Sequence, residues 1–150
     1  QFLYLTDYKE VNIEYSHTAN YSYNMYPKFE DYGEAVLVGE NYSGYIRVDW
    51  YTPNNFKAFG DGRIIIIGTD GYIESKKFID IDGKEGGDHI VVANQSGIRY
   101  LNCQNDTLNF GDYFINAIKS MKGRTSLLEK CFASANLYLS AQQLADKNQI

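Results

Sequence analysis

The hydrophobic pattern of this 150-residue chain changes its period once, near Asn109. Before that residue, apolar and polar side chains alternate in short runs separated by glycine, asparagine and aspartate, a pattern typical of strands with one buried face. After it, apolar side chains recur every three or four residues, as in amphipathic helices. Strands first and helices second predict an α+β fold, with an open antiparallel or mixed sheet and helices on one face.

The alternating part of the chain predicts about seven strands. Asp70-Gly71 lies between two of them and favours a tight hairpin, because this dipeptide supplies positive φ angles. A longer loop, Thr52 to Gly62, separates the third strand from the fourth, and loops of that length often carry function. The expected strands cover residues 10–23, 34–40, 44–51, 63–68, 72–78, 89–93 and 98–102.

Helical segments are expected at both ends of the chain. Residues 1–6 resemble the end of a helix, so the numbering is expected to begin inside a longer protein. A helix from Asn109 is expected to end at Gly123, because glycine is common after a helix C-terminus. The next helix is expected to begin at Ser126, which forms a Ser-x-x-Glu capping box with Glu129.

Composition indicates one globular domain over residues 1–150 and excludes several classes of protein. Hydrophobic residues make up 44% of the chain, enough for a core. The net charge is −5, and no run holds more than two adjacent basic residues, so nucleic-acid binding is disfavoured. Apolar runs such as Ile64 to Ile67 are far shorter than the roughly 20 residues of a membrane-spanning helix. We expect no membrane partner and favour a cytoplasmic location.

No cofactor or metal motif stands out from the sequence. Cys103 and Cys131 share no metal-ligand spacing and are expected to be free thiols. Gly60 and Gly62 have only part of the dinucleotide-binding spacing and lead into a β-branched run, which indicates a loop entering a strand. His17 and His89 lie on separate expected strands, where a structural role is favoured, although Asp88 could orient His89.

Several segments, in their order and spacing, resemble one family of enzymes. They are YPKFEDYGEA at residues 26–35, RVDWYTP at 47–53, GDGR at 60–63, IGTDGYIE at 67–74, GGDH at 86–89 and LYLSAQQLA at 137–145. Together they resemble the C-terminal part of Gfo/Idh/MocA oxidoreductases, the family of glucose-fructose oxidoreductase and inositol dehydrogenase. The resemblance covers nearly the whole chain.

The resemblance implies a two-domain enzyme of which this chain is one domain. In such proteins an N-terminal Rossmann domain binds NAD or NADP, and a C-terminal α+β domain shapes the substrate pocket and forms oligomers through its open sheet. The family's catalytic lysine and histidine precede the stretch that matches residues 1–6. The resemblance therefore implies a chain that is inactive alone, with no catalytic, cofactor-binding or metal-binding residue. The full protein would be a homo-oligomer that oxidises sugars, polyols or their derivatives.

The same resemblance implies substrate contacts in the loop after Trp50. Residues near this stretch approach the substrate in relatives, and hydroxyl, amide and carboxylate groups suit the hydroxyls of a polyol. The expected contacts are Tyr51, Thr52, Asn54 and Asp61. An ordinary surface loop is the alternative for these four residues.

A tyrosine-rich carbohydrate-binding module is the alternative for the whole chain. The sequence holds 14 tyrosines, and six of them lie within residues 4–26. Tyrosine combines apolar area with a polar tip, so a tyrosine-rich open sheet suits either a subunit interface or stacking against sugar rings. A third explanation is the strong preference of tyrosine for strands.

Overall fold

The computed structural model describes residues 1–56, 58, 60–78, 80 and 83–148, which divide into two compact units. Unit 1 comprises Gln1–Tyr51 and Asn109–Ile150, and unit 2 comprises Thr52–Leu108. Each unit has its own sheet. The expectation of one domain over residues 1–150 stays a prediction.

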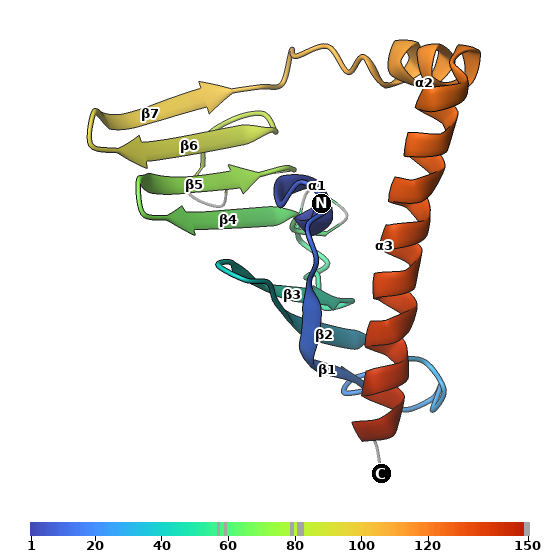
Figure 1. Cartoon of the computed structure of the whole chain (residues 1–150). Coiled ribbons are helices and arrows are strands. Elements are labelled where there is room, and N and C mark those ends of the chain that lie inside the picture. The colour runs from blue at the N-terminus through green and yellow to red at the C-terminus, as the bar shows by residue number, and fades with distance from the viewer. Residues whose placement is uncertain (57, 59, 79, 81–82, 149–150) are drawn as a thin grey trace. The chain divides into compact units, whose positions relative to one another are not determined.

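Unit 1 combines a three-stranded antiparallel sheet with three helices (Figure 1). The strands pair in the order β1-β2-β3, and a bulge interrupts the β1–β2 pairing between Ile13 and Tyr15. The short helix α1 precedes β1, and α3 packs against β1 and α2. The elements are α1 (Phe2–Leu5), β1 (Asn12–Ala19), β2 (Tyr32–Val38), β3 (Ser43–Asp49), α2 (Phe110–Lys119) and α3 (Met121–Asn148).

The two faces of this sheet differ in chemistry because neighbouring residues of a strand point to opposite sides. His17, Glu34 and Arg47 pair across the three strands and share one polar face. Ser16, which is buried, shares the other face with small and apolar residues of β2 and β3. Helix α3 covers this second face near β1, where Asn148 Nδ2 donates a 3.3 Å hydrogen bond to the Ser16 carbonyl oxygen.

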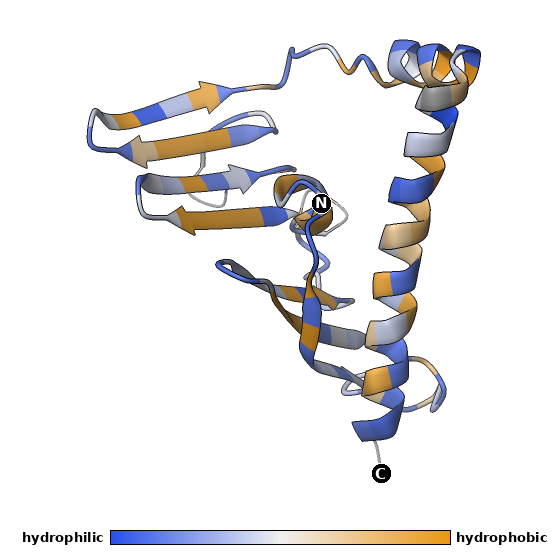
Figure 2. Ribbon diagram, viewed as in Figure 1, coloured by the Kyte–Doolittle hydropathy of each residue, from blue (hydrophilic) through white to orange (hydrophobic). Residues whose placement is uncertain are grey.

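Unit 2 is a meander of four antiparallel strands in the order β4-β5-β6-β7 (Figure 1). The strands are β4 (Arg63–Gly68), β5 (Gly71–Lys76), β6 (His89–Asn94) and β7 (Gly97–Asn102). Figure 2 shows hydrophobic residues along much of β4 and β6. On β4, Ile65 and Ile67 are nevertheless exposed, so this unit carries apolar surface.

The α+β class with open antiparallel sheets is confirmed, and each expected strand is present within the described residues. The first strand is shorter than expected because the Asn20 side chain begins a turn. Its Oδ1 accepts the Tyr23 N–H at 2.9 Å, and its Nδ2 donates to the Tyr26 carbonyl oxygen at 2.8 Å. The seven strands form two sheets, separated in sequence by the loop that contains Pro53.

The hairpin between β4 and β5 is confirmed, but the reason expected for its glycine is wrong. Gly68 pairs with Gly71, so Thr69 and Asp70 form the turn, and neither Asp70 nor Gly71 has a positive φ. A Cβ at Gly71 would lie 2.5 Å from the Ala93 carbonyl oxygen on β6. Glycine is therefore needed here for the close approach of a neighbouring strand.

The boundary between the two C-terminal helices lies earlier than expected. Helix α2 ends at Lys119, and Ser120 is extended. The Ser120 hydroxyl accepts the Gly123 N–H at 3.2 Å, which makes Ser120 the N-cap of α3. The expected start at Ser126 is wrong because this nearer cap begins the helix at Met121. Gly123 lies inside α3, where a Cβ would meet Ala117 Cα at 3.0 Å, so it permits the close packing of α2 and α3.

Candidate functional site

Three tyrosine hydroxyls converge on the Glu34 carboxylate on the polar face of the unit 1 sheet. Tyr45 and Tyr32 donate hydrogen bonds of 2.7 and 2.8 Å to Glu34 Oε2, and Tyr15 donates one of 3.4 Å to Oε1. The residues come from β1, β2 and β3, and the antiparallel register brings them together. We call these four residues the Glu34 cluster.

The hydrogen bonds of the Glu34 cluster hold its carboxylate in the charged form. The Tyr45 and Tyr32 hydroxyls lower the pKa of Glu34 below its ordinary value, against the opposing effect of burial. The same contacts with Tyr45 and Glu34 raise the pKa of Tyr32. Near neutral pH the cluster therefore consists of neutral hydroxyl donors around one negative charge. Unused oxygen lone pairs remain to accept hydrogen bonds from a ligand.

Further aromatic and charged side chains surround the Glu34 cluster. The Arg47 guanidinium lies 5.2 Å from the centre of the Tyr32 ring, and its Nε donates to Asp49 Oδ2 at 2.9 Å. The His17 and Tyr21 rings both lie near Tyr32, and the Tyr21 hydroxyl hydrogen-bonds to His17 Nε2 at 3.1 Å. Aromatic rings beside a carboxylate and a guanidinium can stack against a sugar ring and bind its hydroxyls.

Tyr51, one of the four expected substrate contacts, is hydrogen-bonded to a buried carboxylate in unit 1. Its hydroxyl donates to Asp31 Oδ1 at 2.8 Å, and its ring stacks on Tyr32 with centres 6.4 Å apart. Burial, followed by the hydrogen bond to Asp31, raises the pKa of Tyr51 to about 12. Tyr51 therefore stays protonated near neutral pH and directs that proton to Asp31.

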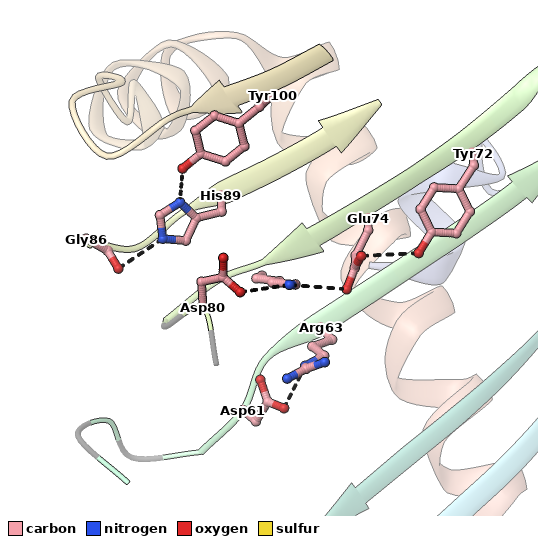
Figure 3. Close-up of polar contacts among 9 residues, drawn as sticks. Asp61, Arg63, Tyr72, Glu74, Asp80, Gly86, His89 and Tyr100 are labelled. Atoms are coloured by element: carbon pink, nitrogen blue, oxygen red, sulfur yellow. Dashed lines mark hydrogen bonds and ion pairs between the residues drawn. The ribbon is translucent and has the colours of Figure 1, made fainter. Parts of the chain in front are cut away.

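The other three expected contacts, Thr52, Asn54 and Asp61, belong to unit 2. Thr52 is half-buried, and Asn54 is exposed in a turn closed by the 2.9 Å hydrogen bond from Phe56 N–H to the Pro53 carbonyl oxygen. Asp61 Oδ2 forms an ion pair with Arg63 Nε at 2.7 Å (Figure 3). The loop's residues 57 and 59 lie outside the described residues. The substrate contacts of all four residues stay predictions.

A cavity of about 500 Å³ lies in unit 1 against the second face of its sheet. Its walls include Ile46 and Val48 from β3 and Leu137 from α3, and polar side chains such as Gln142 also line it. None of the four expected contacts is among the described residues that line this cavity, although Trp50, directly before Tyr51, is. The cavity is large enough for a small ligand.

His89 has two polar partners that give it a structural role in unit 2. It is 1% exposed and lies between Tyr100 and Gly86 (Figure 3). Its Nε2 is 3.1 Å from the Gly86 carbonyl oxygen, which can only accept, so Nε2 carries the proton. In the neutral ring Nδ1 then accepts a hydrogen bond from the Tyr100 hydroxyl. These partners, rather than the preceding Asp88, orient the imidazole.

A second polar network in unit 2 links β5 to the segment after it (Figure 3). Tyr72 donates a 3.2 Å hydrogen bond to Glu74 Oε2, and burial raises the pKa of Tyr72. Lys76 Nζ lies 2.8 Å from Asp80 Oδ1 and 4.0 Å from Glu74 Oε1. These contacts pair charges on β5 and join the end of that strand to Asp80. Residues 81 and 82, which follow Asp80, lie outside the described residues.

The described part of the chain contains no group of three or more His, Cys, Asp or Glu residues placed to hold a metal ion. Cys103 and Cys131 are free thiols, the first half-buried and the second exposed. Burial and the neighbouring Asp106 raise the pKa of Cys103. Among the described helices, none is both long and apolar enough to cross a membrane.

Sequence reasoning did not single out Glu34 or Asp31. Tyr32 and Glu34 are two residues apart on β2, and Tyr45 and Arg47 are two residues apart on β3. The period of two could have placed each pair on one face of its strand, but only the register shows that the two pairs share a face. No comparable signal existed for Asp31. Its carboxylate binds groups 9 to 20 residues away, which only the folded chain brings together.

Comparison with solved structures shows a likeness that covers nearly the whole chain. No protein-family model and no curated protein sequence matches the chain. A solved structure described as a "putative oxidoreductase" from Erwinia carotovora atroseptica SCRI1043 is similar, with a TM-score of 0.83 and 32% sequence identity. The likeness covers 96% of this chain and 44% of that one, so this chain spans less than half the length of that protein. The likeness supports an oxidoreductase-like fold.

Proposed function

We propose that this chain is the substrate-side domain of an NAD(P)-dependent oxidoreductase of the Gfo/Idh/MocA group, acting on sugars, polyols or their derivatives. The main support for the proposal is the 32% identity to a "putative oxidoreductase" structure over 96% of this chain. Because the chain spans 44% of that protein, the activity belongs to a larger protein. The ordered motifs around the loop at Trp50 support the choice of family.

The cofactor is assigned to another part of that larger protein. A dinucleotide site needs a glycine-rich turn that leads into a helix, whose N-terminus faces the pyrophosphate. Here Gly60 and Gly62 lead into strand β4, which begins at Arg63. The described residues around this glycine pair do not fit NAD or NADP, and no step of the reaction is assigned to them.

The role of this chain is to bind and orient the substrate. Thr52, Asn54 and Asp61 offer a hydroxyl, an amide and a carboxylate, which suit the hydroxyl groups of a polyol. Correct orientation of the reacting carbon provides a large part of the rate enhancement in a two-reactant step. The loop at residues 51–61 is therefore proposed to set substrate affinity and orientation, without transferring protons.

The test uses the full-length protein from the complete gene. It should reduce NAD⁺ or NADP⁺ with at least one member of a panel of aldoses, inositols and linear polyols. The absorbance of the reduced nicotinamide measures this reaction. Thr52→Ala, Asn54→Ala and Asp61→Asn should each raise KM for that substrate more than the control Asn105→Ala, an exposed residue of the same unit. Failure to bind either nicotinamide, or to oxidise any member of the panel, would contradict the proposal.

The Glu34 cluster favours a second candidate function, a carbohydrate-binding module. Its rings and carboxylate lie on an open sheet face, where Tyr15 and Tyr45 are 42% and 60% exposed. A glycan array separates the two candidates. Glycan binding by a full-length protein that binds neither nicotinamide would favour the module, and nicotinamide-dependent oxidation would favour the enzyme.

A further inference from the structure

Asp31 connects two loops of unit 1 through one buried carboxylate. Its side chain is 0% exposed. Oδ1 accepts the Tyr21 N–H at 2.9 Å and the Tyr51 hydroxyl at 2.8 Å, and Oδ2 accepts the Ser22 N–H at 2.7 Å. One carboxylate thus joins the loop between β1 and β2 to the segment that follows β3.

The hydrogen bonds keep this buried group charged. Burial by itself raises the pKa of Asp31, but the Tyr21 N–H, the Tyr51 hydroxyl and the Ser22 N–H outweigh it, and the pKa lies below its ordinary value. A buried carboxylate is stable only when such donors replace water. Asparagine has the same shape but only one oxygen, so its NH₂ group would face an N–H or O–H donor.

The backbone of Asp31 holds the same segment at a second point. Its carbonyl oxygen accepts the Trp50 N–H at 3.0 Å. Asp31 therefore binds Trp50 through its main chain and Tyr51 through its side chain. The Tyr51 N–H also donates to Asp49 Oδ1 at 3.1 Å, which fixes the backbone where β3 ends. The chain leaves unit 1 directly after Tyr51.

We propose that Asp31 is a positioning residue that sets the orientation of Tyr51 and the start of the loop at residues 51–61, which we call the substrate loop. The functional part of this inference rests on the proposed function, in which residues 51–61 contact a polyol. Asp31 acts through Tyr51 and Trp50. A side chain held by buried hydrogen bonds is preorganised, so the substrate meets a loop whose first residues need no further ordering.

The experiment compares Asp31→Asn, Tyr51→Phe and the double variant in the full-length protein. Tyr51→Phe removes a single hydroxyl and leaves the backbone donors of Asp31 in place, so it tests the contact if Asp31→Asn fails to fold. Asp7→Asn and Tyr4→Phe make the same chemical changes at exposed positions of unit 1 and serve as matched controls.

The first measurement is hydrogen exchange followed by mass spectrometry, which is independent of activity. Asp31→Asn should speed exchange in peptides covering residues 21–22 and 50–52, while β1, β2 and β3 keep their wild-type protection. Tyr51→Phe should speed exchange at residues 50–52. Unchanged exchange at residues 50–52 in both variants would overturn the positioning role, whether or not a substrate is found.

The second measurement is steady-state kinetics with the best polyol of the panel. Asp31→Asn and Tyr51→Phe should each raise KM for the polyol about ten- to a hundredfold, with KM for the nicotinamide unchanged. The double variant should match the larger single effect, because both changes weaken the same Asp31–Tyr51 contact. A wild-type KM for the polyol in both single variants would overturn the role of Asp31 in the substrate loop. A KM increase in the double variant equal to the product of the two single increases would overturn it as well. A wild-type protein that oxidises no polyol refutes the proposed function instead.

Discussion

Tyr45 donates its hydroxyl proton to Glu34 at 2.7 Å from the neighbouring strand, diagonally across the β2–β3 pair. Glu34 pairs directly with Arg47, and Tyr45 pairs with Val36, so the contact spans two register positions. Long side chains on one face of a sheet reach such diagonal neighbours. The Tyr45 hydrogen bond lowers the pKa of Glu34 more than any other contact of this carboxylate.

Removal of the Tyr45 hydroxyl should therefore raise the pKa of Glu34. Tyr45→Phe keeps the ring and deletes the donor. Tyr15→Phe is the matched control, because its 3.4 Å contact is weaker and should change the pKa less. A carbon-detected NMR titration of the Glu34 carboxyl measures both variants. Equal pKa values in the wild type and Tyr45→Phe would show that this hydrogen bond does not stabilise the charged form.

The stability of the protein should fall in acid through Asp31 and Glu34. Both carboxyls have folded-state pKa values below their ordinary values of 3.8 and 4.5. A lowered folded-state pKa contributes stability above the ordinary pKa, and that stability is lost as the pH falls toward the folded-state value. Urea unfolding followed over a pH series should show a decline beginning near pH 4.5. Glu34→Gln should reduce the slope of that decline, and an unchanged slope would contradict the assignment.

Alanine at Gly71 should destabilise unit 2, whereas alanine at Gly68 should be tolerated. The Cβ at Gly71 would meet the Ala93 carbonyl oxygen at 2.5 Å, but the Cβ at Gly68 has its nearest neighbour at 3.9 Å. Forcing apart two paired strands costs about 1–3 kcal/mol, as for other overpacked sites. Thermal unfolding of Gly71→Ala and Gly68→Ala measures the difference. Equal melting temperatures would refute the close-approach explanation.

The two glycines of the C-terminal helices should respond in opposite ways to alanine. At Gly111, in α2, a Cβ meets nothing within 4 Å, so Gly111→Ala should stabilise the helix by about 0.5–1 kcal/mol. At Gly123, in α3, a Cβ would lie 3.0 Å from Ala117 Cα, so Gly123→Ala should lose that gain or destabilise the protein. Chemical denaturation of both variants tests this. Equal gains would show that α2 and α3 do not pack closely at Gly123.

The exposed apolar side chains of unit 2 should take part in the expected self-association. Ile67 and Ile98 are both 80% exposed, and they share one face because residues 67, 72, 93 and 98 pair in a row across the sheet. A large apolar face of a sheet usually packs against a partner. Sedimentation of the full-length protein should show an oligomer that Ile67→Lys weakens. The exposed turn variant Thr69→Lys is the control, and a monomeric wild type would contradict the prediction.

Hydrophobic periodicity predicted the class of fold, and it placed most strand boundaries within two residues of those in the structure. Period-two alternation predicted the strands, and the three- and four-residue period after Asn109 predicted the helices, because side-chain burial follows backbone geometry. Local signals were less reliable where competing caps were close together. The Ser-x-x-Glu box at Ser126 was outweighed by Ser120, whose hydroxyl caps α3 six residues earlier.

Which side chains meet depends on the tertiary structure. Asp31 and Tyr51 are twenty residues apart, and neither belongs to a motif that predicts their hydrogen bond. The glycine at residue 71 was apparent in the sequence, but its reason was the approach of Ala93 from another strand. Periodicity records which face of an element is buried, whereas contacts between elements depend on register and on where the chain turns. The polar clusters of this protein are contacts of that second kind.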